Sequence, residues 1–599
     1  MNGVNDFAFK IGTVNGTGSA SANGLLMQAI FRMGIPVSGK NIFPSNIQGL
    51  PTWYEIRVSK DGYMARPSEV DLVVALNPAT YAKDVATVRE GGFLLYDSSW
   101  PLPKELERDG IQVLGIPFGR LCVQNFEGDR ERTLLRNIAY AGALTALLGI
   151  DMAVVEKLLE ETYGKKPKLL ASNHTAIRLG REYAEQHFEC PLPFRLERMD
   201  ATGGSILIDG NTACALGALY AGATVGAWYP ITPATSLMEA FKAFCEKYRV
   251  DASTGERRYC ILQAEDELAA AGIVIGAGWA GARAFTNTSG PGISLMQEFI
   301  GLAYYTDIPA VFFDIQRCGP ATGMPTRTQQ ADLVSLAYAS HGDTRHPILF
   351  PANPREAFEM AVQAFDLADR LQTPLFVATD LDIGMNDWMV DRFEWDDSYR
   401  PDRGKVLDAA DLEKLKRFSR YLDVDGDGIA ARTLPGVGGK GAYFVRGSGH
   451  DKHAAYTEDS DAYIEVVDRL RRKFAHAATL VPRPAYTLRA GAEIGLVTLG
   501  GCDAAVREAA DLLAAQEIPV DVMRIRAFPF PEEVREFIES HERVFVVEQN
   551  RDAQLRSLLT IELGIAPERL TPILDYGGMP LTARVVVDSV VRHVGGVPA

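Results

Sequence analysis

Five polar residues of the sequence carry side chains that could together bind an organic acid and move a proton. Each comes at or shortly after the end of an expected strand, and they are Thr232, Glu267, Thr288, Ser289 and Arg317. A guanidinium at a strand end fits a carboxylate through its planar fork of donors. A carboxylic acid beside small apolar residues can hydrogen-bond a ring nitrogen and share its proton, and hydroxyls can donate to the same ligand. These residue types indicate a site for an organic anion with an acid–base group beside it.

Alternating strands and helices would position these residues. The expected strands of this region are 205–208, 223–228, 259–263, 284–288 and 309–315. Strands that alternate with helices predict a parallel sheet, which binds its ligands beyond the carboxyl ends of the strands. All five candidate residues fall at that edge, so we expect them to lie close together.

The stretch 227–236 joins one of these strands to the next helix. Thr232 is a good N-cap residue, and Pro233 suits the first helical position because its missing N–H would have no partner there. A helix that begins here would direct its N-terminus toward the site and favour an anion. The same pattern is also compatible with a well-capped helix that binds nothing.

Two of the candidates have structural alternatives. Glu267 could be a helix-capping acid, although Glu265 or Asp266 would serve equally well in that role. Arg317 could form a structural ion pair with Asp314 or Asp332. Both alternatives stay open at the level of sequence.

The N-terminal region contains two further loops of interest. A Gly-rich turn with Gly16 and Gly18 follows the expected strand 7–11 and precedes a helix, a layout that lets backbone N–H groups approach a phosphate. The loop 41–49 is rigid and rich in donors, and it includes Ser45 and Asn46. Each loop could line a ligand, and each could equally be an ordinary turn.

The predicted fold class is α/β, with three α/β domains at 1–190, 205–385 and 490–599. A charged insertion, 386–484, separates the last two. Within it, Asp423, Asp425 and Asp427 have the spacing of a calcium loop, but Leu434 stands where such a loop has its glutamate. The alternative is an acidic turn without a metal.

Composition narrows the class of protein. The formal net charge is −16 and Lys and Arg form no long block, which argues against nucleic acid or an anionic membrane as a partner. We see no secretory signal and no apolar run long enough for a membrane span, so we expect a cytoplasmic protein. The seven cysteines are scattered without Cys-x-x-Cys spacing, so this chain by itself should hold no iron–sulfur cluster and no structural zinc.

Four longer motifs resemble the α subunit of the 2-oxoacid:ferredoxin oxidoreductases, namely 229–233, 263–267, 288–292 and 316–326. The order of the parts is most similar to the 2-oxoglutarate enzymes, in which a γ domain is fused in front of α. The segments 16–24 and 43–49 match the γ part, and 526–531 and 547–550 match a transketolase-C-terminal-like domain. The resemblance covers almost the whole chain.

The resemblance implies a thiamine diphosphate enzyme that works as a heterodimer with a β subunit. Glu267 would contact the aminopyrimidine ring and activate the cofactor, and Thr232 and Arg317 would contact the 2-oxoacid carboxylate. Further cofactor-binding residues would be Tyr229, Pro230, Thr288 and Ser289, and coenzyme A would dock on the γ domain near Gly16, Gly18, Ser45 and Asn46. The β subunit would hold the diphosphate, Mg²⁺ and a [4Fe-4S] cluster, and ferredoxin would accept the electrons.

A substrate with a second carboxylate would need further hydrogen-bond donors in the site. The second carboxylate of 2-oxoglutarate would meet Thr326 and Arg327, and Arg283 is another candidate. Pyruvate and other 2-oxoacids stay open. Two other classes are also open: a non-redox thiamine carboligase or transketolase-like subunit, and a regulatory protein that binds a nucleotide or coenzyme A without catalysis.

Overall fold

The computed structural model describes residues 3–45, 49–104 and 107–595. The chain divides into two compact units, and each is described by itself. Unit 1 holds the described residues up to Ile208 together with Asn386–Arg392 and Thr582–Arg584, and unit 2 holds the others. Within the described residues, every helix is too short or too polar to serve as a membrane span.

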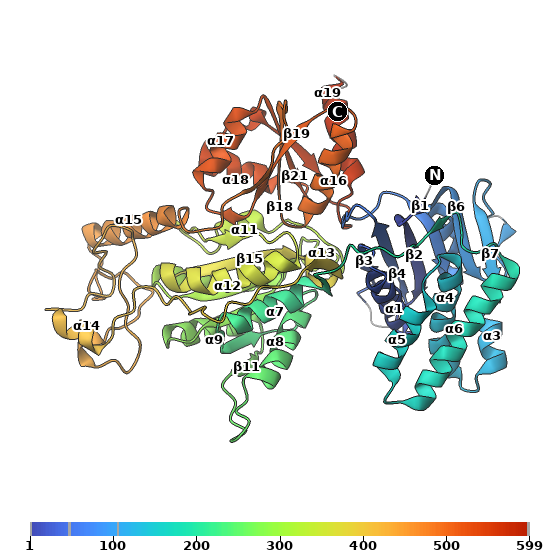
Figure 1. Cartoon of the computed structure of the whole chain (residues 1–599). Coiled ribbons are helices and arrows are strands. Elements are labelled where there is room, and N and C mark those ends of the chain that lie inside the picture. The colour runs from blue at the N-terminus through green and yellow to red at the C-terminus, as the bar shows by residue number, and fades with distance from the viewer. Residues whose placement is uncertain (1–2, 46–48, 105–106, 596–599) are drawn as a thin grey trace. The chain divides into compact units, whose positions relative to one another are not determined.

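Unit 1 is built on a six-stranded mixed sheet (Figure 1). Its strands are, in spatial order, β3 (Val37–Ile42), β4 (Pro51–Ser59), β2 (Asp6–Val14), β5 (Val70–Ala75), β6 (Val88–Asp97) and β7 (Gln112–Ile116). The strand β4 is antiparallel to both neighbours, and the other pairs are parallel. A short parallel pair, β1 (Gly3–Val4) with β8 (Phe194–Arg195), completes the N-terminal region. The expected α/β organisation of this region is confirmed.

Six helices accompany this sheet: α1 (Ser19–Arg32), α2 (Tyr81–Thr87), α3 (Phe118–Asn125), α4 (Asp129–Leu147), α5 (Met152–Tyr163) and α6 (Pro167–His187). The core lies between the sheet and helices such as α1 and α4, where Phe9, Ile11 and Leu144 are fully buried in one apolar cluster. The sequence did not lead us to expect α6.

Unit 2 contains a seven-stranded sheet (Figure 1). The order is β11 (Cys260–Gln263), β10 (Val225–Trp228), β12 (Ala284–Thr288), β13 (Ala310–Gln316), β15 (Pro374–Asp380), β14 (Ile348–Leu349) and β20 (Ala527–Phe528). All neighbours are parallel except β14 and β20. Its helices are α7 (Gly210–Tyr220), α8 (Thr235–Tyr248), α9 (Glu267–Trp279), α10 (Gly290–Tyr305), α11 (Leu333–Ala337), α12 (Pro354–Leu371) and α13 (Leu381–Met385).

The strand order reverses at β10, which lies between β11 and β12. The chain leaves β10 through α8 to reach β11 and returns through α9 to β12 on the other side of β10. Adjacent strands whose connections leave in opposite directions open a crevice beyond their carboxyl ends, and ligands of open α/β sheets bind there. In unit 2 that crevice lies beyond the ends of β10 and β12.

The C-terminal part of unit 2 has a second sheet, in the order β17 (Ala485–Thr487), β19 (Val520–Ile525), β18 (Ile494–Leu499), β21 (Arg543–Glu548) and β22 (Leu570–Leu574). Its helices are α16 (Asp503–Ala514), α17 (Glu532–Ser540) and α18 (Gln554–Leu563), and α19 (Ala583–Val594) ends the described chain. The strand β20 belongs to this part of the sequence yet pairs with β14 of the larger sheet. Phe376, Phe528 and Val546 share one buried cluster, so the two sheets form a continuous core.

The segment between these sheets is mostly irregular, as expected for 386–484. It contains β16 (Trp388–Asp391), the short helix α14 (Ala409–Lys414) and the long helix α15 (Ser460–Ala477). The strand β16 pairs antiparallel with β9 (Ser205–Ile208). The expected strand 205–208 therefore exists, but it forms a separate two-stranded sheet with β16 and does not join the parallel sheet.

Candidate active site

The five candidate residues lie at one edge of the large sheet. Thr288 is the last residue of β12 and Ser289 follows it, whereas Arg317 comes directly after β13. Glu267 is the first residue of α9, and Thr232 lies in the turn after β10. The order of the strands therefore gathers these residues around the crevice beyond β10 and β12.

Glu267 is buried, with 6% of its surface exposed. The cap of α9 is Asp266, whose Oδ1 accepts a 2.7 Å hydrogen bond from the backbone N–H of Ala269. The capping alternative for Glu267 is therefore wrong, because its neighbour performs that role.

The absence of a side chain at Gly292 allows the Glu267 side chain to adopt its position. A Cβ atom at Gly292 would lie 2.9 Å from Cγ of Glu267 and 1.9 Å from Oγ1 of Thr288. Because such approaches are far below normal contact distance, only glycine lets the carboxyl-bearing chain and the Thr288 hydroxyl approach the start of α10 so closely. The Glu267 side chain and the Thr288 hydroxyl therefore both pack against the backbone at Gly292.

Arg317 is anchored to the turn that contains Thr232. Its Nη1 donates a 2.6 Å hydrogen bond to the backbone oxygen of Thr232, while its Nε is buried without a hydrogen-bond partner. Burial lowers the pKa of Arg317, and the charges of Asp332 and Glu267 oppose that shift. The guanidinium thus lies within electrostatic reach of Glu267, and part of its donor set is not used by the protein.

The prediction that Thr232 caps a helix is wrong. The helix α8 begins at Thr235 with Ala234 at the cap position and no side-chain cap, because the chain first makes a turn in which the Ile231 oxygen accepts from the N–H groups of Ala234 and Thr235. Pro233 is accordingly not the first helical residue. The half-buried Thr232 side chain remains at the crevice, but the helix does not use its hydroxyl as a cap.

Two buried asparagines, which the sequence did not reveal as site residues, support this turn. Asn211 Nδ2 donates to the Pro233 oxygen at 2.8 Å, and Asn287 Nδ2 donates to the Ala234 oxygen at 2.6 Å. The neighbouring helix α7 is capped by Asp209, which leaves the Asn211 amide free to hold the turn. In the sequence, each of these asparagines is only a side-chain amide next to an apolar segment. That pattern is too common to indicate a site residue.

Two buried carboxyl groups, Asp314 and Asp332, belong to the surroundings of Arg317. Both oxygens of Asp314 are buried without a hydrogen-bond partner, and burial raises the pKa of this residue well above its usual range. Burial also raises the pKa of Asp332 to about 6, against the lowering effect of Arg317. In the described structure neither carboxylate comes within 4.0 Å of an Arg317 nitrogen, so the alternative of a structural ion pair with Asp314 or Asp332 is wrong.

The loop after Arg317 folds back on itself. The N–H of Cys318 donates to the oxygen of Arg327 at 3.0 Å, so Arg327 lies on the chain segment facing Arg317. Its Nη1 donates to the oxygen and the Oγ1 of Thr326, which is buried. Thr326 and Arg327 therefore lie at the same edge of the sheet as the five residues, and their role toward a substrate stays a prediction.

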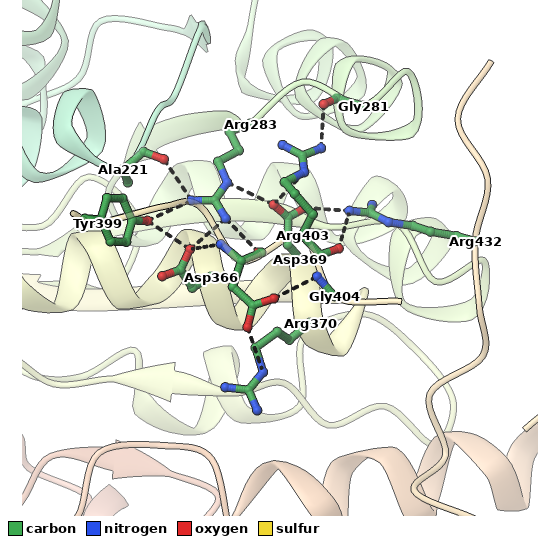
Figure 2. Close-up of polar contacts among 11 residues, drawn as sticks. Ala221, Gly281, Arg283, Asp366, Asp369, Arg370, Tyr399, Arg403, Gly404 and Arg432 are labelled. Atoms are coloured by element: carbon green, nitrogen blue, oxygen red, sulfur yellow. Dashed lines mark hydrogen bonds and ion pairs between the residues drawn. The ribbon is translucent and has the colours of Figure 1, made fainter. Parts of the chain in front are cut away.

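Arg283 is not part of this edge, and its assignment as a substrate-binding candidate is wrong. It precedes β12, whose carboxyl end carries Thr288, so it lies at the opposite end of the strand. Figure 2 shows its guanidinium held by Asp366 and Asp369 of α12, by Tyr399 and by the Ala221 oxygen. These contacts, at 2.7–3.1 Å, saturate the guanidinium and leave it no role toward a substrate.

Exposed apolar side chains surround the crevice. Leu262, Leu268 and Leu295 are 45%, 36% and 54% exposed, and Tyr229 and Pro230 are exposed as well. The helix α9 is almost entirely apolar, yet Leu268, Gly276 and Trp279 remain exposed along it. An all-apolar helix is normally buried on every side, so this edge has the character of an interface.

Three regions of the chain match known protein-family models. Residues 216–390 match the family model described as "Pyruvate flavodoxin/ferredoxin oxidoreductase, thiamine diP-bdg". Residues 8–183 match "Pyruvate ferredoxin/flavodoxin oxidoreductase", and residues 492–586 match "Pyruvate:ferredoxin oxidoreductase core domain II".

Relatives match over nearly the full length. The chain is 30% identical to 2-oxoacid:ferredoxin oxidoreductase 2, subunit alpha, of Aeropyrum pernix, over 98% of this chain and 97% of that protein. The chain belongs to the 2-oxoacid:ferredoxin oxidoreductases. It is also 31% identical to the 2-oxoglutarate synthase subunit KorA of Methanothermobacter marburgensis, over 61% of this chain and 93% of that protein.

A solved member of the 2-oxoacid:ferredoxin oxidoreductases shares the fold. It is the 2-oxoglutarate:ferredoxin oxidoreductase from Magnetococcus marinus with 2-oxoglutarate, coenzyme A and succinyl-CoA bound. The TM-score is 0.88 at 26% identity, and the match covers 98% of this chain and 100% of that chain. The chain is thus an oxidoreductase subunit with a thiamine diphosphate-binding domain, and the resemblance and fold class expected from sequence are confirmed.

The two N-terminal loops of this oxidoreductase subunit lie side by side. The N–H of Asn15 donates to the Leu50 oxygen at 2.9 Å, and the N–H of Gly49 donates to the Asn15 oxygen at 3.3 Å. Gly16 and Gly18 have φ angles of 85° and 86°, a conformation that favours glycine. Ser45 is exposed beside them, and Asn46 lies outside the described residues.

In the acidic loop of the oxidoreductase chain, the aspartates bind the ammonium group of a lysine from a preceding segment. Asp423, Asp425 and Asp427 do come together. The Nζ of Lys405 lies 2.7–2.9 Å from both carboxylate oxygens of Asp425 and of Asp427 and donates to the Ile429 oxygen. A metal at this loop stays a prediction, and it would have to compete with that ammonium.

Proposed function

We propose that this chain is the α subunit of a 2-oxoglutarate:ferredoxin oxidoreductase. The complex would convert 2-oxoglutarate and coenzyme A to succinyl-CoA and CO₂ and reduce ferredoxin. The observation that carries the proposal is the pairing of a buried Glu267 with a partly unused Arg317 at the reversal point of the sheet. One residue can exchange a proton, and the other can hold a carboxylate.

Thiamine diphosphate, when bound, supplies an electron sink for decarboxylation. Two features of the chain fit the ring end of such a cofactor: the Ser289 Oγ is buried without a partner, and Gly292 lets the Glu267 side chain and the Thr288 hydroxyl pack closely together at the start of α10. Glu267 would hydrogen-bond a nitrogen of the aminopyrimidine and exchange a proton with it. Tyr229, Pro230, Thr288 and Ser289 would line the ring.

The substrate would be held by its two carboxylates. Arg317 and Thr232 would bind the carboxylate next to the reacting carbonyl, because Arg317 is held on the Thr232 turn. Arg327 and Thr326, on the facing segment of the same loop, would bind the distal carboxylate that pyruvate lacks. The names of the Methanothermobacter relative and of the Magnetococcus enzyme support 2-oxoglutarate over other 2-oxoacids.

A partner polypeptide would complete the site. The apolar edge formed by Leu262, Leu268 and Leu295 is the surface on which a β subunit would dock. That subunit would bring the diphosphate and Mg²⁺ site and a [4Fe-4S] cluster, because the cysteines of this chain are scattered. Unit 1 would dock coenzyme A at the loops of Gly16, Gly18, Ser45 and Asn46, and ferredoxin would accept the electrons.

Turnover of the purified two-subunit complex on 2-oxoglutarate and on pyruvate tests the proposal. We expect strong preference for 2-oxoglutarate and loss of most of that preference in Arg327→Ala. Arg178→Ala, which changes an exposed arginine of α6, is the matched control and should behave as wild type. Equal rates on both acids in the wild-type complex would contradict the assignment of the substrate.

A further inference from the structure

Three cations meet one carboxylate in the interior of unit 2. Asp307 lies in the turn between α10 and β13, Lys473 and Arg469 come from α15, and Arg420 comes from the irregular segment before it. All four residues are almost fully buried, with at most 3% of their surface exposed. This group lies at the amino end of β13, whereas Arg317 follows the carboxyl end of that strand.

The contacts within the group leave an excess of positive charge. Lys473 Nζ lies 2.5 Å from Asp307 Oδ1, Arg469 Nη1 lies 2.8 Å from Oδ2, and Arg420 Nη1 lies 3.8 Å from Oδ2. Among the described residues, Asp307 is the only carboxylate within 4.0 Å of any of the three cations. Three positive charges therefore face one negative charge, although buried charges are normally paired.

Within the part of the chain that the structure describes, the neighbouring ionic network has no carboxylate available to neutralise the cations around Asp307. The single carboxylate of Asp369 is already shared by Arg283, Arg403 and Arg432 (Figure 2). The charge of Arg420 also contributes to the lowered pKa of Arg432, for which burial is the largest cause. The interior on this side of the sheet is therefore rich in cations beyond the group at Asp307.

Several donors of the two arginines have no acceptor. The Nε and Nη2 of Arg469, which form one donor edge of its guanidinium, are buried without a hydrogen-bond partner. The Nε and Nη1 of Arg420 are in the same state. An unpaired guanidinium donor in the interior is costly, so this arrangement favours a negatively charged acceptor beside these edges.

Aromatic groups form part of the surroundings. The ring of Tyr421 lies 5.0 Å from the Arg420 guanidinium carbon and 5.7 Å from that of Arg469, and His450 packs against the same ring. The Tyr421 hydroxyl and the His450 Nε2 are also buried without partners. The ring faces attract the cations but do not neutralise them.

The protonation behaviour of the group agrees with uncompensated positive charge. Burial lowers the pKa of Lys473 to about 8; Asp307 opposes this shift, and Arg469 and Arg420 add to it. Burial favours the neutral form of Asp307, yet the three cations hold its pKa at about 2. The carboxylate is thus always ionised at neutral pH, and the positive excess remains.

We propose that this group binds a small monovalent anion of the chloride class at the unpaired Nε/Nη2 edge of Arg469, with Arg420 beside it. The anion would complete the charge balance and hold α15 and the segment around Arg420 against the turn after α10. It is a structural site, separate from the crevice that carries Glu267 and Arg317.

Halide dependence of the full-length chain tests the proposal. Thermal unfolding would be compared in sodium chloride and in sodium gluconate at equal ionic strength. We expect chloride to raise the midpoint by about 3 °C in a saturable way, because a ligand that binds only the folded state stabilises it by mass action. Lys473→Met should remove most of that increment, and Arg471→Met, an exposed residue of the same helix, should keep it.

A crystal grown in sodium bromide gives a second measurement that needs no variant. We expect an anomalous peak beside the Nε and Nη2 of Arg469. Equal midpoints in the two salts, an unchanged chloride increment in Lys473→Met, or no anomalous peak at this position would each overturn the proposal and indicate that water alone fills the donor edges. If Lys473→Met does not fold, the bromide peak decides.

Discussion

The Nη1 of Arg317 donates a 2.6 Å hydrogen bond to the backbone oxygen of Thr232. This bond ties the residue that follows β13 to the turn that follows β10, across the intervening end of β12. The turn itself is held from below by the buried amides of Asn211 and Asn287. The guanidinium is therefore positioned by backbone and amide groups that do not depend on the substrate, which is what preorganised recognition of a carboxylate requires.

Glu267→Gln should abolish most turnover of the complex while the chain stays folded. The variant keeps the shape of a buried side chain but cannot exchange a proton, and general acid–base groups typically contribute about 10²- to 10⁴-fold. The measurement is thiamine-dependent reduction of ferredoxin, together with the thermal midpoint. Asp266→Asn is the matched control, because asparagine also caps helices well. Unchanged turnover in Glu267→Gln would exclude the catalytic role.

Arg317→Lys should raise KM for the 2-oxoacid more than it lowers kcat. An ammonium keeps the charge but loses the planar fork that can contact the Thr232 oxygen and a carboxylate together, so we expect a loss of about 10²-fold in kcat/KM. Steady-state kinetics across a range of substrate concentrations separate the two constants. A variant with wild-type KM would show that the carboxylate binds elsewhere.

The edge of the sheet could be predicted from sequence because it depends on element order. Alternating strands and helices, with polar residues directly after the strands, predicted that Thr232, Glu267 and Arg317 would lie together. The segments 526–531 and 547–550 could also be recognised from sequence as motifs, and the structure shows the contacts that they make. Phe528 adds to the large sheet as part of β20, and Gln549 accepts and donates hydrogen bonds that link it to Gln330.

The errors share a cause, which is that local patterns do not reveal long-range partners. The Thr-Pro pair fits a helix start, but the turn at Ile231 and the amides of Asn211 and Asn287 hold the chain in another form. Arg283 is separated from its acids by 83 and 86 residues of sequence, and only the packing of α12 against the sheet brings Asp366 and Asp369 to it. Asp266 rather than Glu267 is the cap because the side chain that meets the Ala269 N–H depends on the exact residue at which α9 begins.

Asp332→Asn should change the dependence of stability on pH. The folded-state pKa of Asp332 is raised to about 6, above its ordinary value of 3.8, so the folded protein binds a proton more tightly than the unfolded chain does. The resulting stabilisation is fully present below about pH 4 and is lost as the pH rises through about 6. We expect wild type to lose stability relative to Asp332→Asn across this window.

The measurement is urea unfolding of both proteins at several pH values between 4 and 7. The difference between the two proteins isolates the effect of Asp332 from groups with the opposite behaviour, such as Glu356. Burial alone would raise the pKa of Glu356, but the hydrogen bond and charge of Arg524 outweigh burial, so this pKa is lowered. Parallel curves for the two proteins would show that Asp332 is not the source of the effect.

Arg283→Met should destabilise unit 2 and leave substrate preference unchanged. The substitution leaves Asp366 and Asp369 with one cation fewer in the interior, and breaking a buried ion pair in this way costs about 3–5 kcal/mol. The network in Figure 2 also ties Tyr399 to the sheet through Arg283, so the irregular segment should become more accessible to protease. Arg258→Met, which removes an exposed ion pair with Asp251, is the control and should leave the thermal midpoint close to that of wild type. Thermal unfolding, limited proteolysis and the ratio of rates on 2-oxoglutarate and pyruvate are the readouts. A change in that ratio would mean that Arg283 acts on the substrate after all, despite its place at the amino end of β12.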